Sequence, residues 1–284
     1  MKAFALAAAV ALIPTAALAW GEDGHAIVAE IAQHRLNEQA ANEITRLLQP
    51  KDKPVYDTPS LASFASWADD IWHENNAFKA TAPWHYIDAP LHDTLTVTQK
   101  NCPDDNCVVK ELDKLKTELR CAKTDEDKRN ALRFAVHFVG DVHQPLHTVD
   151  EAQGGNQIMV HVLFGGDICN QSCLLHDEWQ PLHNVWDTIL IQKTYYNWGR
   201  YVTYLEEQVV KKPDIQADAA TGGPLEWAQE AHAVAPKIWV DDGKSLLDGY
   251  YKMAKPIVDR QLALAGLRLA RFLNEAYSST AACP

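Results

Sequence analysis

His137-Phe-Val-Gly-Asp141-Val-His-Gln-Pro145-Leu-His147 places three potential metal ligands within eleven residues of this chain. His137 and Asp141 are four residues apart, and this spacing puts two side chains on one face of a helix because each residue advances by about 100°. Pro145 then stops the helix, so the chain can turn back and present His147 from the adjoining loop. The segment therefore predicts a helix that leads into a metal site.

The same four-residue spacing recurs at His183-Asn-Val-Trp-Asp187. A single pair of this kind is most often a surface hydrogen bond or a satisfied core histidine, so neither pair alone predicts a metal. Further candidates occur in three short motifs: Trp20-Gly-Glu-Asp-Gly-His25, Ala65-Ser-Trp-Ala-Asp69 and Trp84-His85-Tyr-Ile-Asp88. Neutral imidazole and carboxylate are the ligands that Zn²⁺ takes when no thiolate is used. The accumulation of such motifs predicts a zinc site.

The composition fits one large domain. The chain has 284 residues, of which 47% are hydrophobic and 23% are charged, and this is enough to bury a substantial core. No internal repeat, low-complexity linker or change of composition marks a second domain. We therefore expect a single domain over residues 20–284.

The first nineteen residues have the features of a secretory signal peptide. Lys2 supplies a positive start, an apolar segment follows, and Ala17-Leu18-Ala19 matches a cleavage site. The apolar segment is too short and too rich in small residues for a membrane span, and no later segment has eighteen consecutive apolar residues. We expect a secreted or periplasmic monomer without a membrane anchor, cleaved after Ala19. Cleavage would give Trp20 a free α-amine, which can chelate a metal together with the neighbouring carbonyl.

Six cysteines fit an oxidising compartment, and they allow fifteen pairings. Proximity in the sequence favours Cys102 with Cys107 and Cys169 with Cys173, which leaves Cys121 and Cys283. A cysteine zinc site is the alternative, but the spacings lack a C-x2-C repeat and export favours disulfides.

The chain is acidic, with a formal charge of −12 that becomes −13 when Lys2 is removed with the signal peptide. A protein that holds nucleic acid through many phosphate contacts normally has a basic face, and no such face is evident here. If the substrate is a phosphate ester, bound metal must supply most of the positive potential.

Apolar residues recur at helical spacing, which predicts a mainly α fold with at most a short β-hairpin. The expected helices cover residues 24–48, 60–73, 107–120, 126–143, 178–195, 198–211, 224–236 and 244–278, the last with a potential interruption at Pro256. The one expected strand is Ile158 to Phe164, after the turn-forming Gly154-Gly155-Asn156. Long loops over 74–106 and 144–176 carry several candidate ligands, and loops of this length tend to be functional.

Taken together, these motifs resemble the S1/P1 nuclease family, whose trinuclear zinc centre is shared with zinc-dependent phospholipase C. The resemblance is carried by Trp20 through His25, Ser66-Trp67-Ala68-Asp69, Trp84-His85-Tyr86-Ile87-Asp88, His137 through His147, Gly154-Gly155-Asn156 and His183 through Asp187. These motifs span most of the mature chain and contain nine ligand positions in the family's order. The resemblance implies a single compact multi-helix catalytic domain of the phospholipase C/P1 nuclease type with long active-site loops.

The resemblance also implies three zinc ions per chain. One zinc would be held by Asp69, His85 and His137. Asp141 would bridge it to a second zinc, which would also take His25 and the amine and carbonyl of Trp20. A third zinc would take His147, His183 and Asp187, and positions would stay open for water and substrate.

The implied activity is that of a secreted phosphoesterase acting on single-stranded RNA, single-stranded DNA and 3′-mononucleotides. A water activated by two zinc ions about 3.5–4 Å apart would attack phosphorus. Breaking the P–O3′ bond would give a 5′-phosphate, or nucleoside and phosphate. The expected catalytic residues are Asp69 and Asp141, which would act as metal ligands, and Asn156.

Three residues are expected to contact substrate. Asp88 matches the family position that hydrogen-bonds the nucleobase, and Tyr86 could stack on that base. Asn156, beside two glycines that let backbone approach closely, is a candidate contact to phosphate or substrate. Asp88 could instead cap a loop before Pro90, and Asn156 could serve only the turn.

One position departs from the family pattern. Many relatives carry Arg three residues after the aspartate that corresponds to Asp69, whereas this chain has Trp72. Loss of one preorganised donor could cost on the order of 10²–10³ in rate if no other cation replaces it.

Two other functions compete with a nuclease. A phospholipase C would use the same cluster, but such enzymes tend to have Glu where this chain has Asp187, and no lipid-docking segment is obvious. A non-catalytic zinc-binding protein would explain Trp72 by lost activity. The remaining histidines are expected to be structural; His143 should point away from the ligand face because it lies about 240° around the helix from His137, and His161 should pack in the expected strand.

Overall fold

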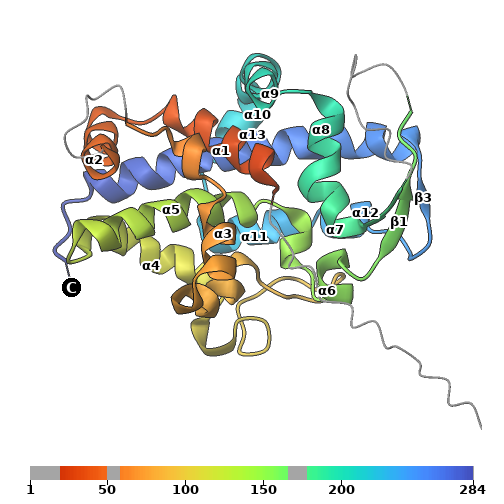
Figure 1. The fold of residues 1–284 in the computed structure, drawn as a ribbon, viewed down its shortest axis with the longest axis horizontal. Coiled ribbons are helices and arrows are strands. Elements are labelled where there is room, and N and C mark those ends of the chain that lie inside the picture. The colour runs from red at the N-terminus through yellow and green to blue at the C-terminus, as the bar shows by residue number, and fades with distance from the viewer. Residues whose placement is uncertain (1–19, 50–57, 166–177, 284) are drawn as a thin grey trace, which may run out of the picture.

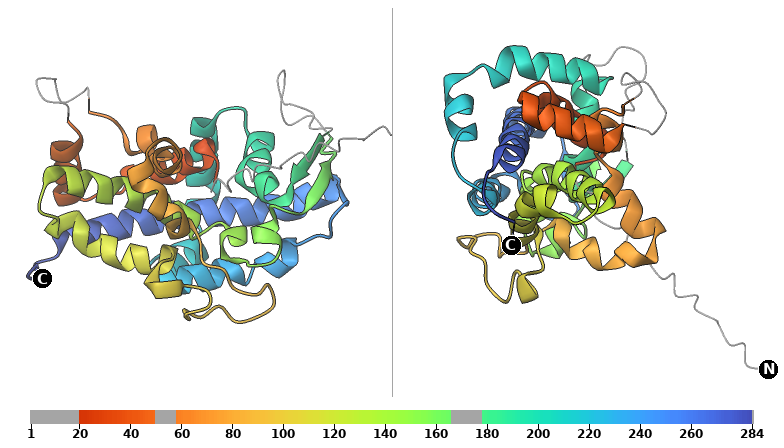
Figure 2. Two further views of the ribbon diagram at one scale, coloured as in Figure 1. Left: turned by 60° about the horizontal axis from the view of Figure 1, so that its bottom comes forward. Right: turned by 90° about the vertical axis from the view of Figure 1, so that its left-hand side faces the viewer.

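Helix α13 (Asp248–Ser278) runs along the length of the molecule, and several other helices pack against it (Figure 1). Every residue from Gln261 to Ala270 is buried, as expected for a helix surrounded on all sides. Helices α1 (Glu22–Gln33) and α5 (Asp125–Asp141) pack against α13 and against each other, as the views in Figure 2 show. These two helices carry much of the candidate site.

This computed structural model describes residues 20–49, 58–165 and 178–283, and the expectation of a mainly α fold is confirmed. The expected signal peptide, residues 1–19, lies outside the described residues. The other α-helices are α2 (Glu38–Leu48), α3 (Trp67–Glu74), α4 (Val108–Cys121), α6 (Ala152–Gly155), α7 (Leu182–Asn184), α8 (Leu190–Thr194), α9 (Trp198–Leu205), α10 (Pro213–Ala219), α11 (Pro224–His232) and α12 (Ala235–Ile238). The 3₁₀ helices are η2 (Leu61–Phe64), η3 (Asn76–His85), η4 (Pro103–Asp105) and η5 (Pro145–Thr148), and the π-helices are η6 (Val185–Ile189) and η7 (Glu206–Val210).

Local sequence explains why α5 begins where it does. The hydroxyl of Thr124 accepts a hydrogen bond from the backbone N–H of Asp127 and caps the helix. Asp125, Glu126 and Asp127 fill the first turn, where negative charge is favoured by the helix dipole. The helix ends at Asp141, four residues before Pro145, and η5 then turns the chain back.

The expectation of one helix over residues 24–48 is wrong, because the segment divides into α1 and α2. The side chain of Asn37 accepts a hydrogen bond from Ala40 N–H and starts a new helix. Asparagine favours such caps over helix interiors. Residues 60–73 divide in the same way, into η2 and α3. Residues 224–236 divide into α11 and α12, and α10 lies in a segment for which no helix was expected.

The start of the helix expected over residues 178–195 is also wrong, because residues 178–181 form strand β2 (Glu178–Pro181). This strand pairs antiparallel with β1 (Met159–Val162), with Met159 opposite Pro181. Pairing with a neighbouring strand here outweighs local helical spacing. Strand β3 (Ser245–Leu246) pairs parallel with β1, so the sheet has the order β2-β1-β3 and is more than a hairpin.

Pro256 does not interrupt α13, which continues through it. Proline removes the hydrogen bond to the carbonyl four residues earlier, that of Lys252. Both residues lie on the exposed side of the helix, where water can satisfy that carbonyl. The packed remainder of α13 then holds the helix together.

The structure contains two of the expected disulfides, Cys102–Cys107 and Cys121–Cys283. Cys169 and Cys173 lie outside the described residues. Among the helices that the structure describes, none is long and apolar enough to cross a membrane.

Candidate metal centre

Buried imidazoles and carboxylates from separate elements meet in three groups. The first group is His25, His137 and Asp141, the second is Asp69, His85 and His137, and the third is His147, His183 and Asp187. Within each group the potential ligand atoms all lie within 4.8 Å of one another, and every member is buried. The structure thus brings together all eight side chains that the sequence predicted as ligands.

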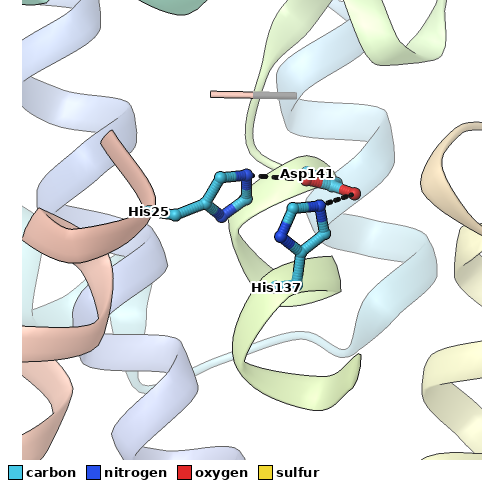
Figure 3. A group of neighbouring side chains, drawn as sticks. All are labelled: His25, His137 and Asp141. Carbon is cyan, nitrogen blue, oxygen red and sulfur yellow. Dashed lines mark ion pairs between the residues drawn. The ribbon is translucent and has the colours of Figure 1, made fainter. Parts of the chain in front are cut away.

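Asp141 stands between the first two groups. Its Oδ1 lies 3.3 Å from Nε2 of His25, whereas its Oδ2 lies 3.1 Å from Nδ1 of His85 and 3.4 Å from Nε2 of His137. Figure 3 shows its carboxylate reaching toward His25 on α1 and His137 on α5. Oδ1 therefore faces the imidazole of His25, whereas Oδ2 faces those of His85 and His137. A carboxylate that bridges two metal ions needs this arrangement.

The separations in the second group fit a common ion. Oδ1 of Asp69 lies 3.4 Å from both Nε2 of His137 and Nδ1 of His85. Ligands about 2.0–2.1 Å from a tetrahedral zinc are about 3.4 Å apart, so the spacing suits coordination better than direct hydrogen bonding.

The third group is assembled by short turns. His147 comes from η5, and His183 and Asp187 come from α7 and η6, with 3.4 Å between Nε2 of His183 and Oδ2 of Asp187. Gly154 has a φ of +60°, and a Cβ there would stand 2.5 Å from the carbonyl oxygen of Leu146. Glycine is therefore required for the turn that approaches His183.

Backbone carbonyls fix the orientation of three imidazoles. Nδ1–H of His137 donates to Ala65 O at 2.7 Å, that of His147 to His85 O at 2.8 Å, and that of His183 to Gly154 O at 2.7 Å. A carbonyl can only accept, so in the neutral ring Nε2 carries the free lone pair. Such a second hydrogen bond is typical of histidines that bind metal. The sequence motifs did not identify Ala65 in this role.

Many of the ligand atoms have no hydrogen-bond partner although they are buried. They are both ring nitrogens of His25 and of His85, Nε2 of His137, His147 and His183, Oδ1 of Asp69, and both oxygens of Asp141. An unsatisfied buried polar group costs about 1–3 kcal/mol, so their concentration here calls for a binding partner. These residues fit divalent metal, and zinc matches the mixture of imidazole and carboxylate.

The electrostatics of the site also favour a cation. Burial, reinforced by His137, lowers the pKa of His25 to about 4, and burial lowers that of His183 to about 3, so both rings are neutral as ligands must be. Burial alone would lower the pKa of His137, but the charges of Asp141 and Asp69 raise it to about 9. The two carboxylates therefore stabilise positive charge beside them.

Trp20 is fully buried next to these groups. The N–H of Gly21 donates to the backbone oxygen of Asp187 at 2.9 Å, which ties the start of the described chain to the third group. A Cβ on Gly24 would stand 2.7 Å from Cβ of Trp20. The backbone next to Trp20 is thus held against Asp187 of the third group.

The three expected substrate contacts lie outside the metal groups. Tyr86 is exposed, and Asp88 is partly buried, with a pKa raised to about 6 by burial and by the charge of Asp150. Asn156 donates from its side-chain amide to the carbonyl of Gln153, a contact within the turn. Trp72 lies in α3, but its side chain is outside the described part of the structure.

His143 lies outside the three metal groups. Its Nδ1–H donates to Val139 O at 2.7 Å, and its Nε2 accepts from the buried Arg268 at 3.1 Å. His161 stacks on Trp179 across β1 and β2, with ring centroids 5.2 Å apart. The structural roles expected for both residues agree with these contacts.

The helical fold and its three buried imidazole–carboxylate groups place this protein among candidate metalloenzymes. The sequence profile described as S1/P1 Nuclease matches residues 20–278, and the chain belongs to this family. It is 31% identical to Endonuclease 4 of Arabidopsis thaliana, an alignment that covers 93% of this chain and 91% of that protein. It is 29% identical to Nuclease P1 of Penicillium citrinum, over 92% and 98%, and 27% identical to Nuclease S1 of Aspergillus oryzae, over 90% and 91%.

Proposed function

We propose that this protein is a secreted zinc-dependent phosphoesterase that cleaves P–O3′ bonds in single-stranded RNA, single-stranded DNA and 3′-mononucleotides. The observation that carries the proposal is the position of Asp141, whose two oxygens face two different sets of imidazoles. Family membership and the names of the relatives support hydrolysis of nucleic acid. The products would be 5′-phosphates, or nucleoside and phosphate.

Three zinc ions would be held by the three groups, with Trp20 completing the first. When bound, zinc lowers the pKa of water and stabilises negative charge on a phosphate ester and its leaving oxygen. The positive charge of the zinc ions would offset part of the formal charge of −12 that the chain itself carries. An acidic protein can therefore hold an anionic substrate.

The chain's own residues would bind and orient that substrate. Tyr86 exposes a ring on which a base can stack, at about 1–3 kcal/mol per base. The carboxylate of Asp88, three residues from His85, would accept hydrogen bonds from the base. Asn156 would contact the phosphate from the turn that also positions His183 through Gly154.

The test uses protein that begins at Trp20 and is loaded with zinc. We expect about three zinc ions per chain by elemental analysis, and hydrolysis of single-stranded RNA and 3′-AMP but not of phosphatidylcholine. Asp141→Asn should abolish this hydrolysis, whereas Asp127→Asn, in the exposed first turn of the same helix, should not.

Other outcomes would overturn the proposal. Turnover of phosphatidylcholine without turnover of nucleotides would indicate a phospholipase C. Zinc-loaded protein without either activity would indicate a non-catalytic metal-binding protein. A precursor that keeps residues 1–19 should bind less zinc, because the amide at Trp20 is a poorer ligand than an amine.

A further inference from the structure

Gln144 lies inside the motif between Asp141 and His147, and its side chain is fully buried. Its Nε2 donates to Oδ1 of Asp187 at 2.6 Å, and its Oε1 accepts from the N–H of Leu146 at 2.6 Å. An N–H can only donate, so the bond from Leu146 fixes the amide oxygen at that side. The NH₂ group is thereby directed at the carboxylate of Asp187.

The backbone of Gln144 contacts two further ligand residues. Its N–H donates to the carbonyl of Asp141 at 2.9 Å, and its carbonyl accepts from the N–H of His147 at 3.0 Å. One residue thus connects the backbone of Asp141 with two members of the third group, His147 and Asp187. None of these bonds uses Nε2 of His147, Nε2 of His183 or Oδ2 of Asp187.

Because of the hydrogen bond from Gln144, the two carboxylate oxygens of Asp187 have different partners. Oδ1 is occupied by the amide, whereas Oδ2 lies 3.4 Å from Nε2 of His183, on the side of the third group. Asp187 is buried and has no Lys or Arg partner among the described residues. Without the amide, its carboxylate could rotate and present either oxygen, or both.

We propose that Gln144 is the positioning residue of the third metal site, which holds Asp187 so that only Oδ2 is offered to the ion. This inference rests on the zinc binding in the proposed function, but it concerns one site of the three. Loss of a residue that orients a metal ligand typically weakens metal binding by about 10–100-fold. We expect a loss of this size for one ion and little change for the other two.

Two variants test the hydrogen bond to Asp187 separately from the hydrogen bond to Leu146 that holds the turn. Gln144→Glu keeps an oxygen that accepts from Leu146 but replaces the donor to Asp187 by a second acceptor. Gln144→Met has similar length and removes both bonds. Thr148→Val is the matched control, because Thr148 is buried in the same turn and neither partner of its hydroxyl is a ligand: the hydroxyl donates to Pro145 O and lies 3.2 Å from Nδ1 of His232.

Zinc per chain is measured by elemental analysis after dialysis against a series of buffered free-zinc concentrations. Both Gln144 variants should hold two ions where the unmodified protein and Thr148→Val hold three, and the third should return at about 10–100-fold higher free zinc. Cobalt-loaded samples should lose the absorption of one site only. Three ions of unchanged affinity in both variants, or equal loss of all three, would overturn the proposal. Unmodified protein that binds three ions without hydrolysing nucleotides would overturn the proposed function alone.

Discussion

Gly140 lies directly against the imidazole of His25, so closely that a Cβ at residue 140 would stand 2.7 Å from Nδ1 of that ring. The ring of His25 also stacks on that of His137, with centroids 3.8 Å apart. His25 therefore has no room to withdraw from a side chain at residue 140. Gly140 has a helical backbone that any residue can adopt. The position therefore needs glycine because of the space that His25 occupies, not because of its backbone conformation.

Gly140→Ala should displace His25 and weaken the first metal group. Overpacking of this kind costs about 1–3 kcal/mol of stability, and we expect zinc per chain to fall together with the melting temperature. Gly249→Ala is the matched control, because nothing lies within 4 Å of a Cβ there and the residue is also helical. Full zinc content in the Gly140→Ala protein would show that the site tolerates the added methyl group.

The affinity for nucleotides should depend on pH through Asp88. Burial and the charge of Asp150 raise its pKa to about 6, so the residue is protonated below that pH and ionised above it. If the carboxylate accepts from the base, KM for 3′-AMP should fall as the pH rises through about 6. The raised pKa also means that the fold favours the protonated form of Asp88. The contribution of Asp88 to the free energy of unfolding is therefore full below its ordinary pKa and is lost as the pH rises through about 6.

Two variants check the assignment to Asp88. Asp88→Asn should remove this pH dependence and raise KM. Asp150→Asn should move the dependence to lower pH, because it removes a charge that opposes ionisation of Asp88. A pH profile of KM that is the same in all three proteins would exclude Asp88 from substrate binding.

His232 should hold the segment after Asp88 in place. Its Nδ1 lies 2.9 Å from the carbonyl oxygen of Thr148 in η5, and its Nε2 lies 3.1 Å from that of Pro90. His232→Ala would remove one hydrogen bond each from the carbonyls of Thr148 and Pro90, which keep the N–H groups of Ala89 and Asp93 as donors. At about 0.5–1.5 kcal/mol per bond the loss of stability should be modest, and we expect a higher KM with little change in kcat. His92→Ala, at an exposed position of the same segment, should leave both constants unchanged. A fall in kcat alone would point to the metal site instead.

The Cys121–Cys283 disulfide should matter for stability more than for activity. It joins residues that are 162 apart in the sequence, whereas Cys102–Cys107 closes a separation of 5. A longer closed loop constrains the unfolded chain more, so Cys121→Ser with Cys283→Ser should lower the free energy of unfolding by about 2–5 kcal/mol. The double variant Cys102→Ser with Cys107→Ser should lower the free energy of unfolding by less. Denaturant unfolding measures both, and equal losses would contradict this chain-entropy argument.

The sequence identified the eight side chains of the three buried groups because the motifs that contain them are local. His137 and Asp141 share a helix face through their spacing alone, and the flanking motifs mark the other candidates. The fold class followed from apolar periodicity in the same way. The boundary at Asn37, by contrast, depends on one capping hydrogen bond, and β2 depends on a partner strand that precedes it by about twenty residues.

The residues that orient the ligands could not be found by spacing. Ala65 acts through a carbonyl oxygen that every residue possesses, so its identity carries no signal. Gln144 was visible in the motif, but only the fold shows that Asp187 lies beside its amide. Gly154 was expected to let the backbone approach substrate, whereas its carbonyl holds His183.

The central position of α13 has a consequence for when the protein can become active during its synthesis. This helix is translated after every ligand residue, yet it packs against both α1 and α5, which carry the first group. A ribosome-bound chain that still lacks α13 leaves the faces of α1 and α5 that this helix covers exposed to water. The metal centre should therefore reach its full stability only after the C-terminal helix has left the ribosome.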